Sequence, residues 1–157
     1  MKKIDFKKLA ISVIIPLFVG GLSALITINA MGGYSELDKP ALSPPALVFP
    51  IVWTAIYILM GISSYLVYKS PADESDKREA FTLYGLQLIF NFFWSIIFFN
   101  LELYSLAFVW LLALVGLVVA TALAFFRINK VSGILMIPYI LWGFFAGYLN
   151  LMIAILN

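Results

Sequence analysis

The sequence predicts an all-α integral membrane protein, a bundle of five transmembrane helices. Of its 157 residues, 64% are hydrophobic and 11% are charged, and the mean hydropathy is +1.05. A typical soluble domain is about half apolar and about a quarter charged. The few charges also leave five long uncharged runs, and a bilayer-spanning helix needs about 20 mostly apolar residues. Each run is therefore long enough to cross a membrane once.

The five expected spans follow from these runs. They cover residues 9–29, 46–68, 80–100, 104–126 and 132–155. A transmembrane β-barrel would alternate polar and apolar residues in segments of about 10, and no run has that pattern. The longest expected loops, residues 30–43 and 69–79, are too short for a second folded unit, so residues 1–157 are expected to form one membrane domain.

The basic residues predict how the bundle lies in the membrane. With five spans, nine of the ten Lys and Arg residues fall on one side: Lys2, Lys3, Lys7, Lys8, Lys69, Lys77, Arg78, Arg127 and Lys130. Cytoplasmic loops carry an excess of such residues. We therefore expect the protein in the cell membrane, with its N-terminus in the cytoplasm and its C-terminus on the outer side. These charges are read as topology signals and contacts with membrane lipid, and no nucleic-acid partner is expected.

The residue types that are absent exclude several classes of function. The chain has no Cys and no His, which removes thiol nucleophiles, imidazole bases and the usual ligands of zinc and haem iron. No metal site and no required cofactor are expected. Every charged side chain lies outside the runs, whereas proton relays and ion-coupled transporters need ionisable groups within the membrane. The remaining chemistry is aromatic and amide, and it suits a flat apolar guest.

Three helix faces show how such a lining could form. In the second span, Phe49, Trp53 and Tyr57 recur every four residues and so lie on one side of a helix. Two further faces carry Gln87, Asn91, Trp94 and Phe98 in the third span, and Pro138, Trp142, Ala146 and Asn150 in the fifth. For Trp53 and Trp142, packing and binding are both open. Amides such as Asn91 also commonly hold helices together in membranes.

Prolines surround the start of the second span. Pro44 and Pro45 are expected near its first turn, where a proline costs no hydrogen bond and fixes the approach of the preceding loop. Pro50 is expected further inside the helix, where it would remove a hydrogen bond and bend the first turns.

Several motifs, taken in order, resemble one family. They are KP at 39–40, SPP at 43–45, FPIVWTAIY at 49–57, LMG at 59–61, SYLV at 64–67, QLIFNFFWS at 87–95 with FF at 98–99, and PYILW at 138–142 through LN at 149–150. The chain resembles the TspO/MBR family of tryptophan-rich sensory proteins and mitochondrial translocator (peripheral benzodiazepine receptor) proteins. The resemblance extends over nearly the whole chain.

The resemblance implies a five-helix bundle, often a homodimer, that binds porphyrins such as protoporphyrin IX as well as hydrophobic benzodiazepine-type and isoquinoline-carboxamide drugs. In the family the ligand lies in a cavity under the long first loop. Carried onto this sequence, the lid residues are Tyr34, Pro44 and Pro45, and the wall residues are Phe49, Trp53, Tyr57, Phe90, Asn91, Trp94, Trp142 and Ala146.

The chain also departs from the family pattern. Members often carry further tryptophans in and after the first loop, where this chain has Gly33, Leu42 and Leu47. Mitochondrial members have a sterol motif of Tyr and then a basic residue near the end of the fifth helix. Here Leu151 is followed by no charge, so cholesterol is not expected at that site.

Two kinds of function remain open. The first is a receptor or sensor that binds porphyrin, free base rather than haem, because the chain has no His or Cys. Its enzyme-like variant is the light- and oxygen-dependent porphyrin degradation linked to bacterial relatives, in which Trp53 and Trp142 would be the photochemically oxidised indoles. The alternative is a transporter or scaffold for porphyrin, lipid or sterol, although five unpaired spans lack the paired repeats of alternating-access carriers.

Overall fold

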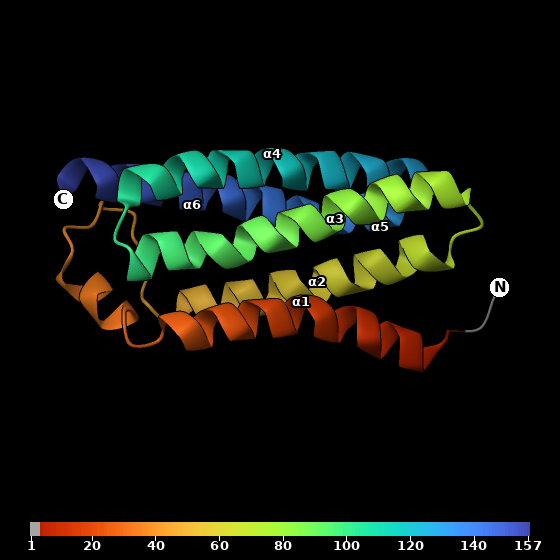
Figure 1. Cartoon of the computed structure of the whole chain (residues 1–157), viewed down its shortest axis with the longest axis horizontal. Coiled ribbons are helices and arrows are strands. Elements are labelled where there is room, and N and C mark those ends of the chain that lie inside the picture. The colour runs from red at the N-terminus through yellow and green to blue at the C-terminus, as the bar shows by residue number, and fades with distance from the viewer. Residues whose placement is uncertain (1–3) are drawn as a thin grey trace.

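Five long helical spans lie side by side in the computed structural model, which describes residues 4–157 (Figure 1). The spans are α1 (Phe6–Thr27), α2 (Val48–Lys69), α3 (Glu74–Ser95) continued by the π-helix η2 (Ile96–Asn100), α4 (Tyr104–Ile128), and α5 (Lys130–Leu135) followed by α6 (Ile137–Leu156). A short 3₁₀ helix, η1 (Met31–Glu36), lies in the first loop. No strand occurs between residues 4 and 157. The predicted fold class is confirmed.

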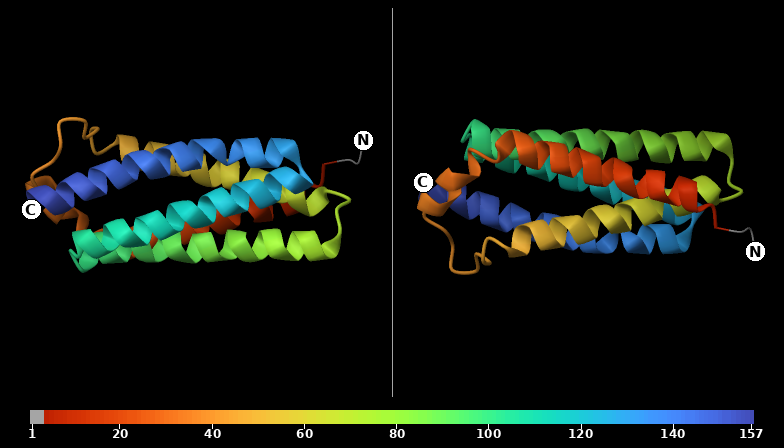
Figure 2. Two further views of the ribbon diagram at one scale, coloured as in Figure 1. Left: turned by 90° about the horizontal axis from the view of Figure 1, so that it is seen from above. Right: turned by 90° about the horizontal axis from the view of Figure 1, so that it is seen from below.

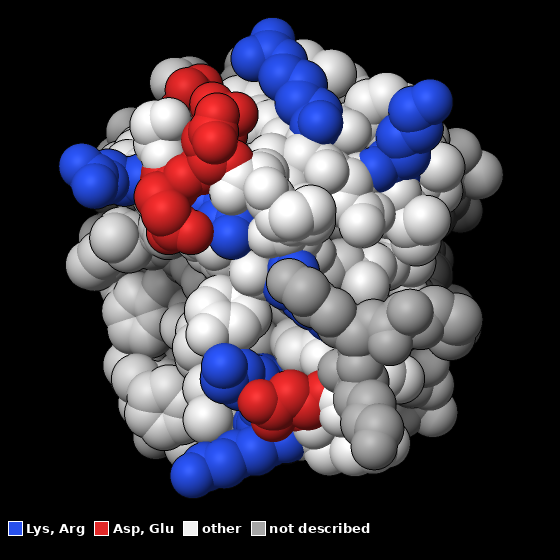
Figure 3. All heavy atoms as spheres, turned by 90° about the vertical axis from the view of Figure 1, so that its right-hand side faces the viewer, with Lys and Arg blue, Asp and Glu red and all other residues white. Residues whose placement is uncertain are grey.

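The described chain ends lie at opposite ends of the bundle (Figure 2), as an odd number of spans requires. One end carries the start of α1, the α2–α3 loop and the α4–α5 junction. Lys and Arg side chains are spread over that end, with a patch of Asp and Glu among them (Figure 3). The other end carries η1 and the end of α6. Which side of the membrane each end faces stays a prediction from the basic residues.

The third helix begins earlier than its apolar run. It starts at Glu74 instead of residue 80, so the loop before it spans only residues 70–73. Glu74 and Asp76 lie in its first turn, where their negative charges interact favourably with the positive end of the helix dipole. The charged segment expected as a loop is therefore mostly helix.

The prolines before the second span are placed differently from the expectation. Helix α2 begins at Val48, whose backbone N–H donates to Pro45 O at 2.9 Å, so Pro44 and Pro45 precede the helix and Pro45 starts the turn that leads into it. Pro50 is the third residue of α2, where a backbone N–H has no partner within the helix. The prediction that Pro50 removes a helical hydrogen bond is wrong.

The fifth span is interrupted at Met136. Pro138 has no backbone N–H to give to Ile134 O, so the helix cannot continue through this point without a break. Met136 N instead donates to Gly133 O at 3.1 Å and ends α5, while Ile140 N donates to Met136 O at 3.2 Å as α6 begins. The break lets α5 pack on α2, where Ser63 Oγ donates to Ser132 O at 2.8 Å in a fully buried contact.

Packing divides the bundle into two halves. Near the charged end the interior is closely packed; Met60, Phe125 and Met136 are each 0% exposed. The outer surface carries large apolar side chains such as Phe18 and Leu141, each 65% exposed, as expected for a surface that faces lipid. Open space inside the bundle lies in the other half.

Helices α1 and α2 approach each other closely at Gly61. A Cβ atom there would overlap Val13 Cα and lie 2.8 Å from Ser12 O, both backbone atoms that cannot move aside. We expect Gly61→Ala to destabilise the protein by about 1–3 kcal/mol, the usual effect of overpacking. Gly21→Ala is the control, since nothing lies within 4 Å of its added Cβ. Thermal unfolding in detergent should show a lower midpoint for Gly61→Ala alone, and equal midpoints for both variants would contradict this account.

Candidate functional site

A partly open cavity of about 380 Å³ lies in the half of the bundle next to the first loop. Ligand sites in proteins span roughly 300–1,000 Å³. Its lining residues come from α1, the first loop, α2, α3, η2 and α6: Gly20, Ala24, Met31, Tyr34, Ala46, Phe49, Pro50, Trp53, Tyr57, Asn91, Trp94, Ser95, Phe98, Phe99, Ala146, Leu149, Asn150 and Ile153. None of these is an Asp, Glu, Lys or Arg. The cavity is therefore an apolar and aromatic space with a few amide and hydroxyl groups.

Helix α2 supplies one aromatic wall. Phe49, Trp53 and Tyr57 all line the cavity, because their four-residue spacing puts them on one helix face. The rings of Trp53 and Tyr57 stack, with centroids 5.5 Å apart and planes at 25°. Trp53 also meets Tyr139 of α6 edge to face at 5.8 Å. The aromatic wall on α2 is therefore supported by a contact with α6.

The π-helix η2 supplies the opposite wall. Its wider turn is marked by Leu101 N donating to Ile96 O, five residues back, at 3.0 Å. Both Phe98 and Phe99 line the cavity as a result, and Phe98 stacks on Trp94 with centroids 5.3 Å apart. Such π-segments occur frequently at functional sites. The spacing in the sequence predicts that Trp94 and Phe98 lie on one face of the third span, but it does not predict that Phe99 joins them.

The first loop covers the cavity. The ring of Tyr34 lies 6.1 Å from those of Phe49 and Phe99 and 6.3 Å from that of Phe98, so it bridges the two aromatic walls. Burial raises the pKa of the Tyr34 hydroxyl above its usual value, so this group stays neutral at physiological pH. Lys39 Nζ lies 5.1 Å from the centre of the Tyr34 ring.

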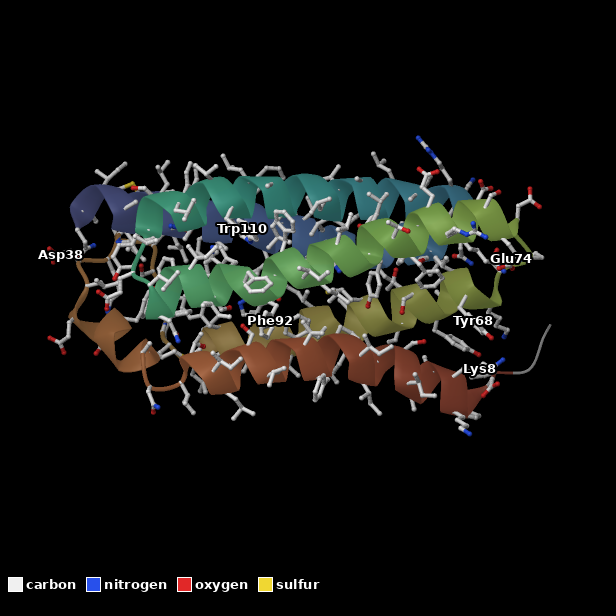
Figure 4. The ribbon with its side chains drawn as sticks, viewed as in Figure 1. Lys8, Asp38, Tyr68, Glu74, Phe92 and Trp110 are labelled. Atoms are coloured by element: carbon white, nitrogen blue, oxygen red, sulfur yellow. The ribbon has the colours of Figure 1, made fainter. Side chains whose placement is uncertain are left out.

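The same loop is tied to the end of α6. Asp38 N donates to Asn157 Oδ1, and Asn157 Nδ2 donates back to Asp38 O, both at 3.0 Å. Asp38 lies at the outer edge of the loop in Figure 4, which places this pair at the rim of the bundle. The pair is exposed, so it holds the loop by two hydrogen bonds that water can replace.

Polar groups in the cavity wall are held by partners on other helices. Tyr57 Oη donates to Asn91 Oδ1 at 2.7 Å, and Asn91 Nδ2 donates to Tyr139 Oη at 2.9 Å, so one amide joins α2, α3 and α6. Nearer the loop, Trp94 Nε1 donates to Asn150 Oδ1 at 3.1 Å. Asn91 therefore joins helices and lines the cavity at once, and the two roles considered from its sequence position are compatible.

The structure separates the predicted site residues into two groups. Seven line the cavity: Tyr34, Phe49, Trp53, Tyr57, Asn91, Trp94 and Ala146. Pro44, Pro45, Phe90 and Trp142 do not. Phe90 faces α4 and stacks on Trp110 with centroids 4.3 Å apart, and Trp110 Nε1 donates to Phe90 O. Trp142 lies behind Phe49, edge to face at 5.9 Å, with its buried N–H lacking an acceptor among residues 4–157.

Sequence reasoning missed the contribution of the first helix. Gly20 and Ala24 of α1 line the cavity, yet α1 has no aromatic face to signal a site. From the sequence, small side chains four residues apart indicate that another helix packs closely there. This spacing gives no sign that the two residues line a cavity. Gln87 shares the predicted polar face of α3 but lies deeper, fully buried and without a hydrogen-bond partner in the described chain.

Two smaller hollows lie at the charged end of the bundle. One, of about 320 Å³, is lined by residues including Asp76, Glu79 and Arg127, and the other, of about 230 Å³, by residues including Lys77 and Arg78. Both are open, charged surface grooves between helix ends. They lack the convergent apolar lining that typifies small-molecule sites.

Comparison with known proteins assigns the family. The TspO/MBR family matches residues 12–156. The chain is 36% identical over 124 residues to "Tryptophan-rich protein TspO" of Chlorobaculum tepidum (79% of this chain, 78% of the relative) and 33% identical over 153 residues to that of Archaeoglobus fulgidus (96% and 97%). It is 35% identical over 120 residues to the "Translocator protein" of Bos taurus (74% and 70%). With its five membrane-length helices, the chain is a multi-pass integral membrane protein and belongs to the TspO/MBR family.

Proposed function

We propose that this protein is a membrane receptor that binds flat aromatic ligands in the cavity: porphyrins such as protoporphyrin IX, and benzodiazepine-type or isoquinoline-carboxamide compounds. The observation that carries the proposal is a cavity of about 380 Å³ whose lining has aromatic walls on two sides and no charged side chain. Aromatic walls bury the faces of a planar guest, and a few fixed polar groups orient its edge.

The energetics support this class of ligand. Each 100 Å² of apolar guest surface removed from water contributes about 2.5 kcal/mol. A charged group inside the cavity would be desolvated without an ion-pair partner, which is unfavourable. The aromatic body of the guest would therefore lie inside, with any carboxylate at the mouth beneath the first loop. The absence of His and Cys from the chain favours free-base porphyrin over haem.

The enzyme-like variant places the photochemistry at Trp53. A photoexcited porphyrin would take one electron from an indole in contact with the macrocycle, which oxidises the indole, and dissolved oxygen would then add to the porphyrin radical and open the macrocycle. Trp53 lines the cavity, as Trp94 does, whereas Trp142 does not line it and contacts Phe49, which does. Degradation of bound porphyrin in light would therefore depend strongly on Trp53 and less on Trp142.

The alternative is transport or scaffolding, which the name of the bovine relative, "Translocator protein", suggests. Carriage through the bundle needs a path to its far end. Below the cavity the interior is filled by fully buried side chains such as Met60, Phe125 and Met136. This packing favours binding at one end of the bundle over passage through it. Liposomes loaded with porphyrin on one side separate the two, since binding without net flux supports the receptor.

Binding should be visible in tryptophan fluorescence. Titration with protoporphyrin IX is expected to quench the emission saturably. Trp53→Phe should weaken the affinity for the porphyrin, because the smaller ring loses part of a stacking interaction worth about 1 kcal/mol. Trp110→Phe is the matched control, since Trp110 packs on Phe90 outside the cavity. Linear, non-saturating quenching, or equal losses in both variants, would refute the proposed site.

Photodegradation gives a second test. Under illumination in air, Trp53→Phe should lose most of the porphyrin-degrading rate of the parent, and Trp142→Phe should lose less. Absorbance of the porphyrin band follows the reaction, and circular dichroism checks that both variants stay helical. If Trp53→Phe degrades porphyrin at the parental rate, the indole role assigned to it is wrong.

The amide of Asn91 gives a third test. Asn91→Leu removes the bridge between Tyr57 and Tyr139, so we expect affinity for isoquinoline carboxamides to fall more than affinity for a plain hydrocarbon probe. A hydrogen bond to a ligand is typically worth about 1 kcal/mol, or roughly five-fold in affinity. Equal losses for both ligands would instead mean that Asn91 only holds the helices together.

A further inference from the structure

We propose that Gly20 of α1 is a positioning residue for the cavity: its missing side chain lets Tyr57 reach Asn91 and hold that amide for ligands that carry a carbonyl group. The inference deepens the proposed binding function and rests on it. It concerns a helix that contributes no aromatic or amide group to the site. Gly20 itself lines the cavity, next to the Tyr57 ring.

The Tyr57 ring occupies the space that a side chain at position 20 would need. A Cβ atom at position 20 would overlap Tyr57 Cε2 and Cζ and lie 2.8 Å from its hydroxyl oxygen. All three atoms belong to the far end of one side chain, and no backbone atom is among them. An added methyl group would therefore displace the phenol ring and leave the helix packing in place.

The position of that ring decides how Asn91 is held. Tyr57 Oη donates to Asn91 Oδ1 at 2.7 Å, and the amide passes the connection on to Tyr139 at 2.9 Å. Trp53 stacks on the same phenol, with centroids 5.5 Å apart. The ring therefore touches both Trp53 and Gly20, and its position depends on the space that Gly20 leaves. A shift of the ring would break the bond to Asn91 and free the amide to rotate.

A held amide can select ligands. A side-chain amide has two N–H donors and two acceptor lone pairs. The two phenols occupy one of each, so one N–H and one lone pair are not used by them. Asn91 is 3% exposed and lines the cavity, so a guest would reach this amide at the cavity wall. A carbonyl on a flat guest can accept that N–H, whereas a hydrocarbon of the same shape cannot. Fixing the amide beforehand avoids the entropy of ordering it on binding.

Anthraquinone and anthracene are a suitable probe pair, since they share a flat three-ring shape and only the first has carbonyls. Binding would be measured by tryptophan-fluorescence quenching in lipid nanodiscs, with empty nanodiscs correcting for partition of the probes into lipid. The parent should prefer anthraquinone by about two- to ten-fold, the value of one hydrogen bond. Gly20→Ala should abolish this preference while its circular dichroism spectrum and unfolding midpoint stay close to those of the parent.

Gly21→Ala is the matched control, because its added Cβ meets nothing within 4 Å on the same helix. It should keep the parental preference. Tyr57→Phe removes only the hydroxyl and should lose the preference as Gly20→Ala does. If Gly20 acts through Tyr57, the double variant loses no more than either single variant. This non-additivity distinguishes positioning from a general loosening of the fold, which would weaken both probes alike.

Three results would overturn the inference: a parent without preference between the probes or without binding to either, a Gly20→Ala variant that keeps the preference, or additive losses in the double variant. Failure of the proposed function looks different. A parent that discriminates between the two probes but shows no saturable binding of protoporphyrin IX would contradict the porphyrin proposal and leave the role of Gly20 standing.

Discussion

The structure depends on one constraint: lipid tails offer no hydrogen-bond partner, so the polar groups at the cavity wall need partners within the bundle. The chain of hydrogen bonds from Tyr57 through Asn91 to Tyr139 meets this constraint and joins α2, α3 and α6 around the cavity. Interhelical hydrogen bonds of this kind are worth about 0.6 kcal/mol each in membranes. Their larger effect here is geometric, since they fix polar atoms at the wall of an otherwise apolar space.

Much of this arrangement can be predicted from the sequence. Uncharged runs predict the five spans, because charge is unfavourable in lipid, and a four-residue spacing predicts the α2 wall with Phe49, Trp53 and Tyr57. Spacing fails where backbone geometry changes. The π-helix brings Phe99 to the wall beside Phe98, and Trp142 is turned behind Phe49. The cavity-facing role of Gly20 has no signal in the sequence, since a glycine that admits a neighbouring ring resembles any glycine at a helix crossing.

The two halves of the bundle have different physical roles. Near the charged end, close packing of apolar side chains and the buried Ser63–Ser132 contact hold α2, α4 and α5 together. Near the other end, aromatic walls stand apart under the first loop, where Tyr34 packs against both walls and Asp38 pairs with Asn157 at the rim. A closely packed half therefore supports a half with room for a guest, and the loop over that room is held by aromatic contacts and by two exposed hydrogen bonds.

The most direct test of this account is an experimental structure of the protein with protoporphyrin IX bound. The account predicts density for the macrocycle inside the bundle, in contact with Trp53 on one side and with Trp94 and Phe98 on the other, beneath Tyr34. Density for the porphyrin on the lipid-facing surface, with the space between these rings closed by side chains, would contradict it.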